Sequence, residues 1–186
     1  MTALEAFNNC TSGGYKNTDN YLSWKIENDI MYFQCSRQKE DWLRNFDIIF
    51  RKTILNWSPI ILTEGFDEAF EEVLSLLKLF DVDGFVGYSH GAVIASLCSA
   101  VTDKPAIVFG CPNYMLFPSA MTKRQFSKVT SYENVEDIVT KIPPVYTRCG
   151  TIIKMKTPVI KPVDVSLVEW LSGHSPKMYR QRLEVL

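Results

Sequence analysis

The segment Gly87-Tyr88-Ser89-His90-Gly91 has residue types and spacing that could support nucleophilic chemistry. An apolar run leads into it, and an apolar run of small residues beginning at Ala92 leaves it. In a nucleophile elbow a strand enters a tight turn and a helix leaves it, so that the serine hydroxyl projects above the sheet edge. The flanking residues must be small because side chains would collide across the bend. This context predicts Ser89 as a nucleophile; the alternative is a hydrogen-bonded serine in an ordinary strand–helix turn.

A serine hydroxyl is a poor nucleophile unless a neighbouring base accepts its proton. The chain contains two histidines, His90 and His174. The side chain of His90 starts from the emerging helix, and we expect it not to reach back to Ser89. The elbow fold requires the chain order serine, acid, histidine, which only His174 satisfies. We therefore predict His174 as the base, the alternative being a solvated loop histidine.

The base in turn needs a carboxylate to orient it. Asp137 is the best placed, because it follows an expected strand and precedes a loop stiffened by Pro143-Pro144, and acids of such sites lie on loops after strands. Its neighbour Glu136 is the obvious rival. The other carboxylates considered between Ser89 and His174 are Asp103, Glu133, Asp164 and Glu169.

The elements that would position these residues alternate between strands and helices. Apolar residues three and four apart predict a helix over Gly65–Phe80, and a turn at Asn28-Asp29 predicts a hairpin of Ser23–Glu27 and Ile30–Cys35. Further strands are expected in the segments DGFVGYS, KPAIVFG, FSKVTSYEN and TIIKMKTPV, and helices in GAVIASLCSAV and on both sides of Gly173. This alternation predicts an α/β fold with a mostly parallel sheet, formed as one domain over residues 1–186.

Composition narrows the function classes. The 186 residues are 46% hydrophobic and 22% charged, with a net charge of −1, which fits a globular chain without a nucleic-acid footprint. The five cysteines are scattered and form no C-x-x-C pair, so we expect reduced thiols and neither a metal site nor disulfides. We recognise neither a signal peptide nor an apolar run of about 18 residues that could span a bilayer, and expect a cytoplasmic protein. Basic residues at Arg180–Arg182 are expected on a solvated face.

Four segments, in the correct order, resemble motifs of the class 3 (fungal-type) lipases. VGYSHGAVIASL resembles the elbow of that family, VFGCPNY its next strand, YENVEDIVTKIPP its acid loop and GHSPKMY its C-terminal histidine motif. The resemblance covers about Ile30 to Tyr179. It implies a minimal α/β-hydrolase fold that works without a cofactor, with Asp137 as the catalytic acid and His174 as the catalytic base.

The resemblance also implies an oxyanion hole. The family's F-R-G-[ST] motif, followed by a D-W segment, is similar to FQCSRQKEDW, which begins at Phe33. The backbone N–H groups of Ser36 and His90 would then hold the oxyanion. FRKT at Phe50–Thr53 is rejected because nothing like D-W follows it. This sequence departs from the family at Gln34, Cys35 and Tyr88, which replace an arginine, a glycine and a histidine.

By the same alignment, residues Arg37–Phe46 occupy the position of the family's lid. Trp42, Leu43 and Phe46 would form an apolar face that covers the serine in water and turns towards a lipid surface. The same pattern also fits an ordinary surface helix packed on the sheet.

The sequence therefore predicts a serine carboxylester hydrolase acting on lipid esters, acylglycerols or phospholipids, with contact to a membrane or droplet surface limited to the periphery. Two alternatives stay open. The altered FQCS loop could indicate a lipase-like scaffold or lipid-binding protein with impaired catalysis, and the triad could instead serve small esters or thioesters. The sequence carries no indication of the oligomeric state.

Overall fold

A seven-stranded sheet forms the centre of the computed structural model, which describes residues 1–17, 22–35, 50–55, 58–156 and 172–186. Its strand order is β1-β2-β3-β6-β7-β9-β10. The pairs β1–β2 and β2–β3 are antiparallel, and the four pairs from β3–β6 to β9–β10 are parallel. These strands are β1 (Lys16–Asn17), β2 (Leu22–Glu27), β3 (Ile30–Cys35), β6 (Gly84–Tyr88), β7 (Ala106–Phe109), β9 (Val129–Asn134) and β10 (Thr151–Met155).

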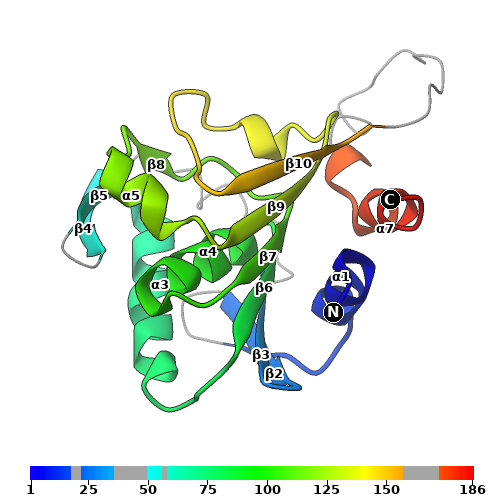
Figure 1. Ribbon diagram of the computed structural model, residues 1–186, viewed down its shortest axis with the longest axis horizontal. Coiled ribbons are helices and arrows are strands. Elements are labelled where there is room, and N and C mark those ends of the chain that lie inside the picture. The colour runs from blue at the N-terminus through cyan, green and yellow to red at the C-terminus, as the bar shows by residue number, and fades with distance from the viewer. Residues whose placement is uncertain (18–21, 36–49, 56–57, 157–171) are drawn as a thin grey trace.

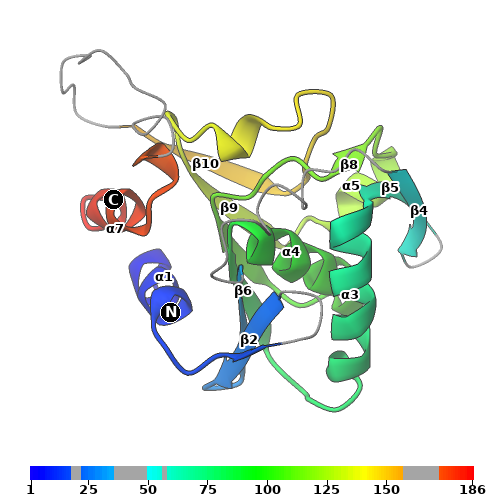
Figure 2. The same cartoon turned by 180° about the vertical axis from the view of Figure 1, so that it is seen from behind.

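Helices cover both faces of this sheet (Figures 1 and 2). Helices α3 (Glu64–Leu77) and α4 (His90–Thr102) lie against one face, and α1 (Ala3–Thr11) and α7 (Pro176–Leu183) against the other. The two chain ends therefore lie on the same side of the sheet. The mostly parallel sheet flanked by helices is confirmed.

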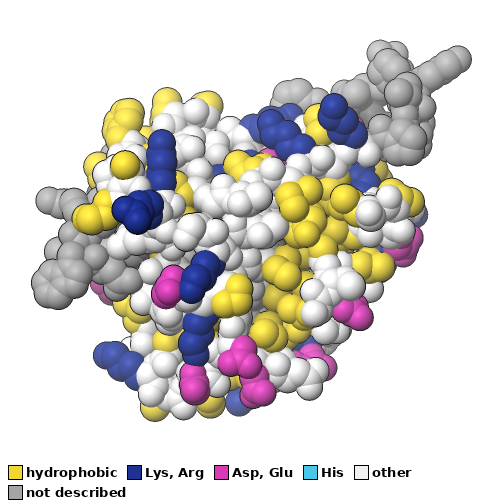
Figure 3. Space-filling view, viewed as in Figure 1, with side chains coloured by type: hydrophobic (Ala, Val, Ile, Leu, Met, Phe, Trp, Pro, Cys, Tyr) yellow, Lys and Arg dark blue, Asp and Glu magenta, His cyan; other side chains and the backbone are white. Residues whose placement is uncertain are grey.

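The two faces bury separate hydrophobic clusters. The larger cluster joins α3 and α4 to the sheet through residues such as Phe66, Val93 and Phe85. The smaller one lies under α1 and α7 and includes Phe7, Tyr88 and Tyr179. Hydrophobic side chains also reach the surface between the strands and these two helices (Figure 3).

A second, three-stranded antiparallel sheet was not expected from the sequence. It has the order β4-β5-β8, formed by β4 (Phe50–Leu55), β5 (Ser58–Thr63) and β8 (Met115–Leu116). The rejected FRKT segment lies in β4 of this sheet. Short helices α5 (Ala120–Gln125), η1 (Val139–Lys141) and η2 (Ser172–His174) complete the described elements.

The predicted elements that fall on described residues agree closely with the observed ones, whereas the helix expected before Gly173 falls on residues 157–171, outside that part of the chain. The hairpin β2–β3 forms with Ile26 opposite Met31, and both turn residues, Asn28 and Asp29, have positive φ. Helix α3 ends at Leu77, three residues before the predicted end. Strands β3, β6, β7 and β9 run parallel and in register, so their carboxyl ends meet at one edge of the sheet. That edge carries the candidate site.

Candidate active site

Ser89 lies between β6 and α4 in a backbone conformation that non-glycine residues rarely adopt. Its φ is 57° and its ψ is −124°. Such strained conformations cluster at functional sites, where the surrounding structure maintains them. Ser89 is the N-cap residue of α4, and serine is a preferred cap, yet its side chain makes no capping hydrogen bond. The hydroxyl is therefore available for another partner.

The two glycines of the motif allow the elbow to close. A Cβ atom on Gly87 would lie 2.2 Å from the carbonyl oxygen of Gly91, and one on Gly91 would lie 2.4 Å from the carbonyl oxygen of Phe33. These backbone atoms belong to the elbow itself and to the neighbouring strand β3, so neither clash can be relieved by a side-chain movement. The expected need for small flanking residues thus has a steric cause.

His174 brings its imidazole to the Ser89 hydroxyl across 85 residues of sequence. Its Nε2 atom lies 2.8 Å from Ser89 Oγ. His90, in contrast, stacks its ring on Phe66 of α3, with the ring centroids 5.0 Å apart. Of the two histidines, only His174 contacts the serine hydroxyl.

Asp137 contacts the other ring nitrogen of the same imidazole. His174 Nδ1 lies 2.8 Å from Asp137 Oδ2, and the Asp137 side chain is completely buried. The carboxylate also accepts hydrogen bonds from the Val139 backbone N–H at 2.9 Å and from the Tyr179 hydroxyl at 2.6 Å. Because an ionised carboxylate only accepts, the imidazole proton belongs on Nδ1, and Nε2 is left to accept the Ser89 proton.

The competing carboxylates have other partners. Glu136 Oε2 lies 2.6 Å from Arg182 Nη1, so this rival of Asp137 is engaged away from the imidazole. Arg182 is buried, which corrects the expectation of a solvated face at Arg180–Arg182: the helix α7 turns this arginine inward to pair with Glu136. Glu133 pairs with Arg148, and the exposed Asp103 pairs with Lys128. Asp164 and Glu169 lie outside the described residues.

Tyr179 is a site residue whose role the sequence did not indicate. It lies five positions after His174 in the GHSPKMY segment, on the inner side of α7, and is fully buried. Burial raises the pKa of its hydroxyl well above the ordinary value, and the negative charge of Asp137 raises it further. Tyr179 therefore stays protonated and remains a hydrogen-bond donor to the acid.

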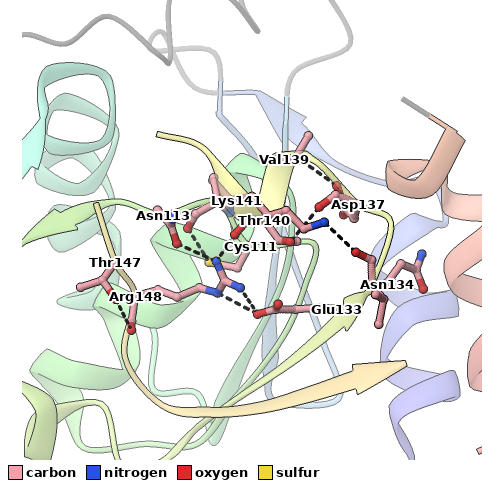
Figure 4. A network of polar contacts seen from close by, with 12 residues as sticks. Cys111, Asn113, Glu133, Asn134, Asp137, Val139, Thr140, Lys141, Thr147 and Arg148 are labelled. Atoms are coloured by element: carbon pink, nitrogen blue, oxygen red, sulfur yellow. Dashed lines mark hydrogen bonds and ion pairs between the residues drawn. The ribbon is translucent and has the colours of Figure 1, made fainter. Parts of the chain in front are cut away.

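A buried polar network supports the acid loop (Figure 4). The side chain of Arg148, which is 8% exposed, forms an ion pair with Glu133 and donates to Asn113 Oδ1 at 2.7 Å. It also donates to the backbone carbonyl of Thr140, whose own hydroxyl donates to the Asp137 carbonyl at 2.9 Å. Arg148 thus ties the loop that carries Asp137 to the end of β9.

The same loop is joined to the segment that carries His174. The side-chain amide of Asn134, the last residue of β9, donates to the Gly173 carbonyl at 2.7 Å. The backbone N–H of Asn134 donates to the Tyr179 hydroxyl at 3.3 Å. The loop of Asp137 and the segment of His174 are therefore held by a common set of buried hydrogen bonds.

Of the two residues predicted to form the oxyanion hole, His90 lies within the described part of the chain. His90 is the first residue of α4, and backbone N–H groups of a first helical turn point out of the helix end and have no intrahelical acceptor. Strand β3 passes beside the elbow, since Phe33 and Gln34 are the backbone neighbours of Gly91. Ser36 and the candidate lid residues Trp42, Leu43 and Phe46 lie outside the described residues.

The described part of the chain offers neither a metal cluster nor a membrane-spanning helix. Within the described ranges, no group of three or more His, Cys, Asp or Glu side chains is arranged to hold a metal ion. In the same part of the chain, no helix combines the length and the apolarity that crossing a bilayer requires.

Comparison with solved structures finds fungal lipases. The LIP2 lipase of Yarrowia lipolytica is 14% identical with a TM-score of 0.58, and the match covers 81% of this chain and 68% of that one. The Rhizomucor miehei lipase in its propeptide complex is 17% identical with a TM-score of 0.52, covering 77% and 56%. The mono- and diacylglycerol lipase of Aspergillus oryzae is 19% identical with a TM-score of 0.50, covering 82% and 64%.

These likenesses establish the fold. The chain has a small α/β-hydrolase fold, as predicted, and it spans between 56% and 68% of the length of the three structures. No protein-family model matches the chain, and no curated protein sequence matches it. The activity must therefore be argued from the site itself.

Proposed function

We propose that the protein is a serine carboxylester hydrolase of the class 3 lipase type that acts on lipid esters. The observation that carries the proposal is the continuous chain of hydrogen-bonding contacts from Ser89 through His174 to Asp137, with both distances at 2.8 Å. Three residues far apart in sequence meet in the geometry that makes an alcohol oxygen nucleophilic. The fold shared with fungal lipases supports the choice of an ester as substrate.

In the first half of the reaction, Ser89 Oγ attacks the ester carbonyl carbon while its proton passes to His174 Nε2. The imidazolium is stabilised by Asp137, whose position the hydroxyl of Tyr179 and the N–H of Val139 maintain. Collapse of the tetrahedral intermediate breaks the bond to the alcohol, which leaves with the proton from His174. The acyl group stays on Ser89.

In the second half, a water molecule gives its proton to His174 Nε2 and attacks the acyl carbon. The carboxylic acid leaves and Ser89 regains its proton. Both intermediates place negative charge on the former carbonyl oxygen, and the N–H groups of His90 and Ser36 are the proposed donors to it. Each such donor typically stabilises the transition state by about 3–4 kcal/mol.

Lipid esters are the proposed substrate class, because the structures that share this fold are lipases, one of them a mono- and diacylglycerol lipase. The predicted apolar face of Trp42, Leu43 and Phe46 would favour a long acyl chain. Water-soluble short esters and thioesters are the alternative that the substrate profile separates.

The test is hydrolysis of p-nitrophenyl esters of increasing acyl length by the wild type and by Ser89→Ala. We expect turnover that rises with acyl length and falls by at least about 10³-fold in the variant, because only substrate binding and oxyanion stabilisation remain without the nucleophile. Equal rates in the two proteins would remove the proposal. A preference for acetyl esters over long chains would keep the hydrolase and reject the lipid substrate.

A further inference from the structure

Tyr88, the last residue of β6, contacts the catalytic base in two ways. Its ring stacks on the imidazole of His174, with the centroids 5.1 Å apart and the planes 18° from parallel. Its hydroxyl donates a hydrogen bond to the backbone carbonyl of the same histidine. Tyr88 therefore touches both the ring and the main chain of the residue that must accept the Ser89 proton.

Neighbouring aromatic rings hold Tyr88 in place. Phe7 of α1 meets its ring edge to face at 5.6 Å, and Tyr179 of α7 meets it at 5.8 Å. Tyr88 is 7% exposed and belongs to the cluster under α1 and α7. A side chain confined in this way, on a central strand of the sheet, is a rigid surface for the imidazole.

The orientation of the imidazole plane decides whether Nε2 points at Ser89 Oγ. The bond to Asp137 fixes Nδ1 but leaves the ring able to rotate about that contact. Stacking on Tyr88 restricts this rotation, because a tilted ring would lose the parallel contact. The negative face of the phenol ring also favours the positive charge that the imidazole carries after accepting a proton.

We infer that Tyr88 is a positioning residue for His174 and sets the alignment of the base with the nucleophile. This inference rests on the proposed function, since it assigns His174 the role of base. It gives a mechanistic meaning to a departure in the elbow motif, where tyrosine occupies the position before the nucleophile. The residue acts through His174 and makes no bond to the reacting atoms.

The test compares three variants. Tyr88→Leu removes the stacking and the hydroxyl, Tyr88→Phe removes the hydroxyl alone, and Phe85→Leu is the matched control. Phe85 lies on the same strand and is buried, but it packs in the opposite cluster, against Phe33. Each protein is measured for kcat and KM on the best p-nitrophenyl ester, for urea unfolding, and for the downfield proton NMR signal of a His174 Nδ1–H bonded to Asp137.

For Tyr88→Leu we expect kcat to fall about 50-fold with KM within about twofold, because small misplacements of a catalytic group cost about that much. The downfield signal should broaden or disappear. Tyr88→Phe should lose about fivefold in kcat and keep the signal. Phe85→Leu should be destabilised while its kcat stays within about twofold of the wild type and its signal is unchanged.

The inference is overturned if Tyr88→Leu keeps its kcat and its downfield signal, or loses no more kcat than Phe85→Leu does. Should Tyr88→Leu not fold, an unchanged kcat in Tyr88→Phe overturns it instead. Absence of Ser89-dependent hydrolysis in the wild type would end the proposed function. The NMR comparison would still decide whether Tyr88 orients His174, so the two failures are distinguishable.

Discussion

At the scale of single residues, the site depends on which carboxylate faces His174. Asp137 and Glu136 are adjacent in sequence and lie in one loop, so chain order could not separate them. The fold separates them, because Asp137 turns into the interior to His174, whereas Glu136 is half exposed and pairs with Arg182. The path of the backbone thus turns one of two adjacent carboxylates towards His174 and the other towards Arg182.

Replacing each of these carboxylates by its amide tests the assignment. Asp137→Asn should lower kcat by about 10⁴-fold, because the amide favours the wrong imidazole tautomer. Glu136→Gln, the isosteric control one residue away, should stay within about threefold of the wild type. The measurement is kcat on the best p-nitrophenyl ester after urea unfolding has shown that both variants fold. Comparable losses in the two variants would contradict the assignment of the acid.

At the scale of elements, the loop between β9 and β10 carries Asp137, the proposed acid, and is held by a buried ion pair. Burial raises the pKa of Glu133, although the guanidinium of Arg148 opposes this effect. Arg148 has a second task, because its bond to the Thr140 carbonyl fixes the turn just after Asp137. The pair therefore links the stability of the fold to the position of the acid.

Replacing Arg148 alone should lower the free energy of unfolding more than replacing Arg148 and Glu133 together. Arg148→Met leaves Glu133 buried and unpaired, which typically costs about 3–5 kcal/mol in the free energy of unfolding. Arg148→Met combined with Glu133→Leu should recover most of this loss. Both proteins should still lose about tenfold in kcat, because the Thr140 carbonyl loses its donor in each. Urea unfolding and kcat test this, and a double variant no more stable than Arg148→Met would contradict it.

Some of these elements could be predicted from the sequence and others could not. The elbow, the parallel strands and His174 were predictable because local residue patterns and chain order determine them. The roles of Tyr88 and Arg148 were not, since each depends on contacts with segments brought together only by folding. The second sheet was missed because β5 contains Pro59 and its partner β8, of only two residues, lies far from it in the sequence. Helix α1 carried an overlooked signal, the capping box of Thr2 and Glu5.

At the scale of the whole molecule, the described residues form a mostly parallel sheet with helices on both faces, a fold shared with the neighbouring structures. The chain spans 56–68% of the structures that it resembles, and α1 and α7 are the described helices on one face. The two hydrophobic clusters bury four free cysteines, Cys10, Cys98, Cys111 and Cys149. The single-domain assignment stays a prediction.

Because of the thiols of Cys10 and Cys111, the free energy of unfolding should fall at alkaline pH. Burial raises the pKa of Cys10 and of Cys111 from 9.0 to about 12. Between pH 9 and about pH 12 the thiols of the unfolded chain lose protons that the folded chain retains. The folded state then binds more protons, so the free energy of unfolding falls as the pH rises. Each thiol should contribute a slope of up to about 1.4 kcal/mol per pH unit above pH 9.

Urea unfolding between pH 8 and pH 11 measures this slope. A variant carrying Cys10→Ala and Cys111→Ala should be less stable at pH 8, because it loses packed sulfur atoms, but should lose less stability towards pH 11. An identical pH slope in the two proteins would show that these thiols do not titrate on unfolding.

The central claim is that Ser89 becomes a nucleophile because His174 and Asp137 meet beside it. The most direct measurement is the intact mass of the protein after exposure to a fluorophosphonate, followed by peptide mapping, with Ser89→Ala as the control. We predict one adduct per chain, located on Ser89, and none in the variant. A folded wild-type protein that stays unlabelled, or that carries its adduct on another residue, would contradict the account.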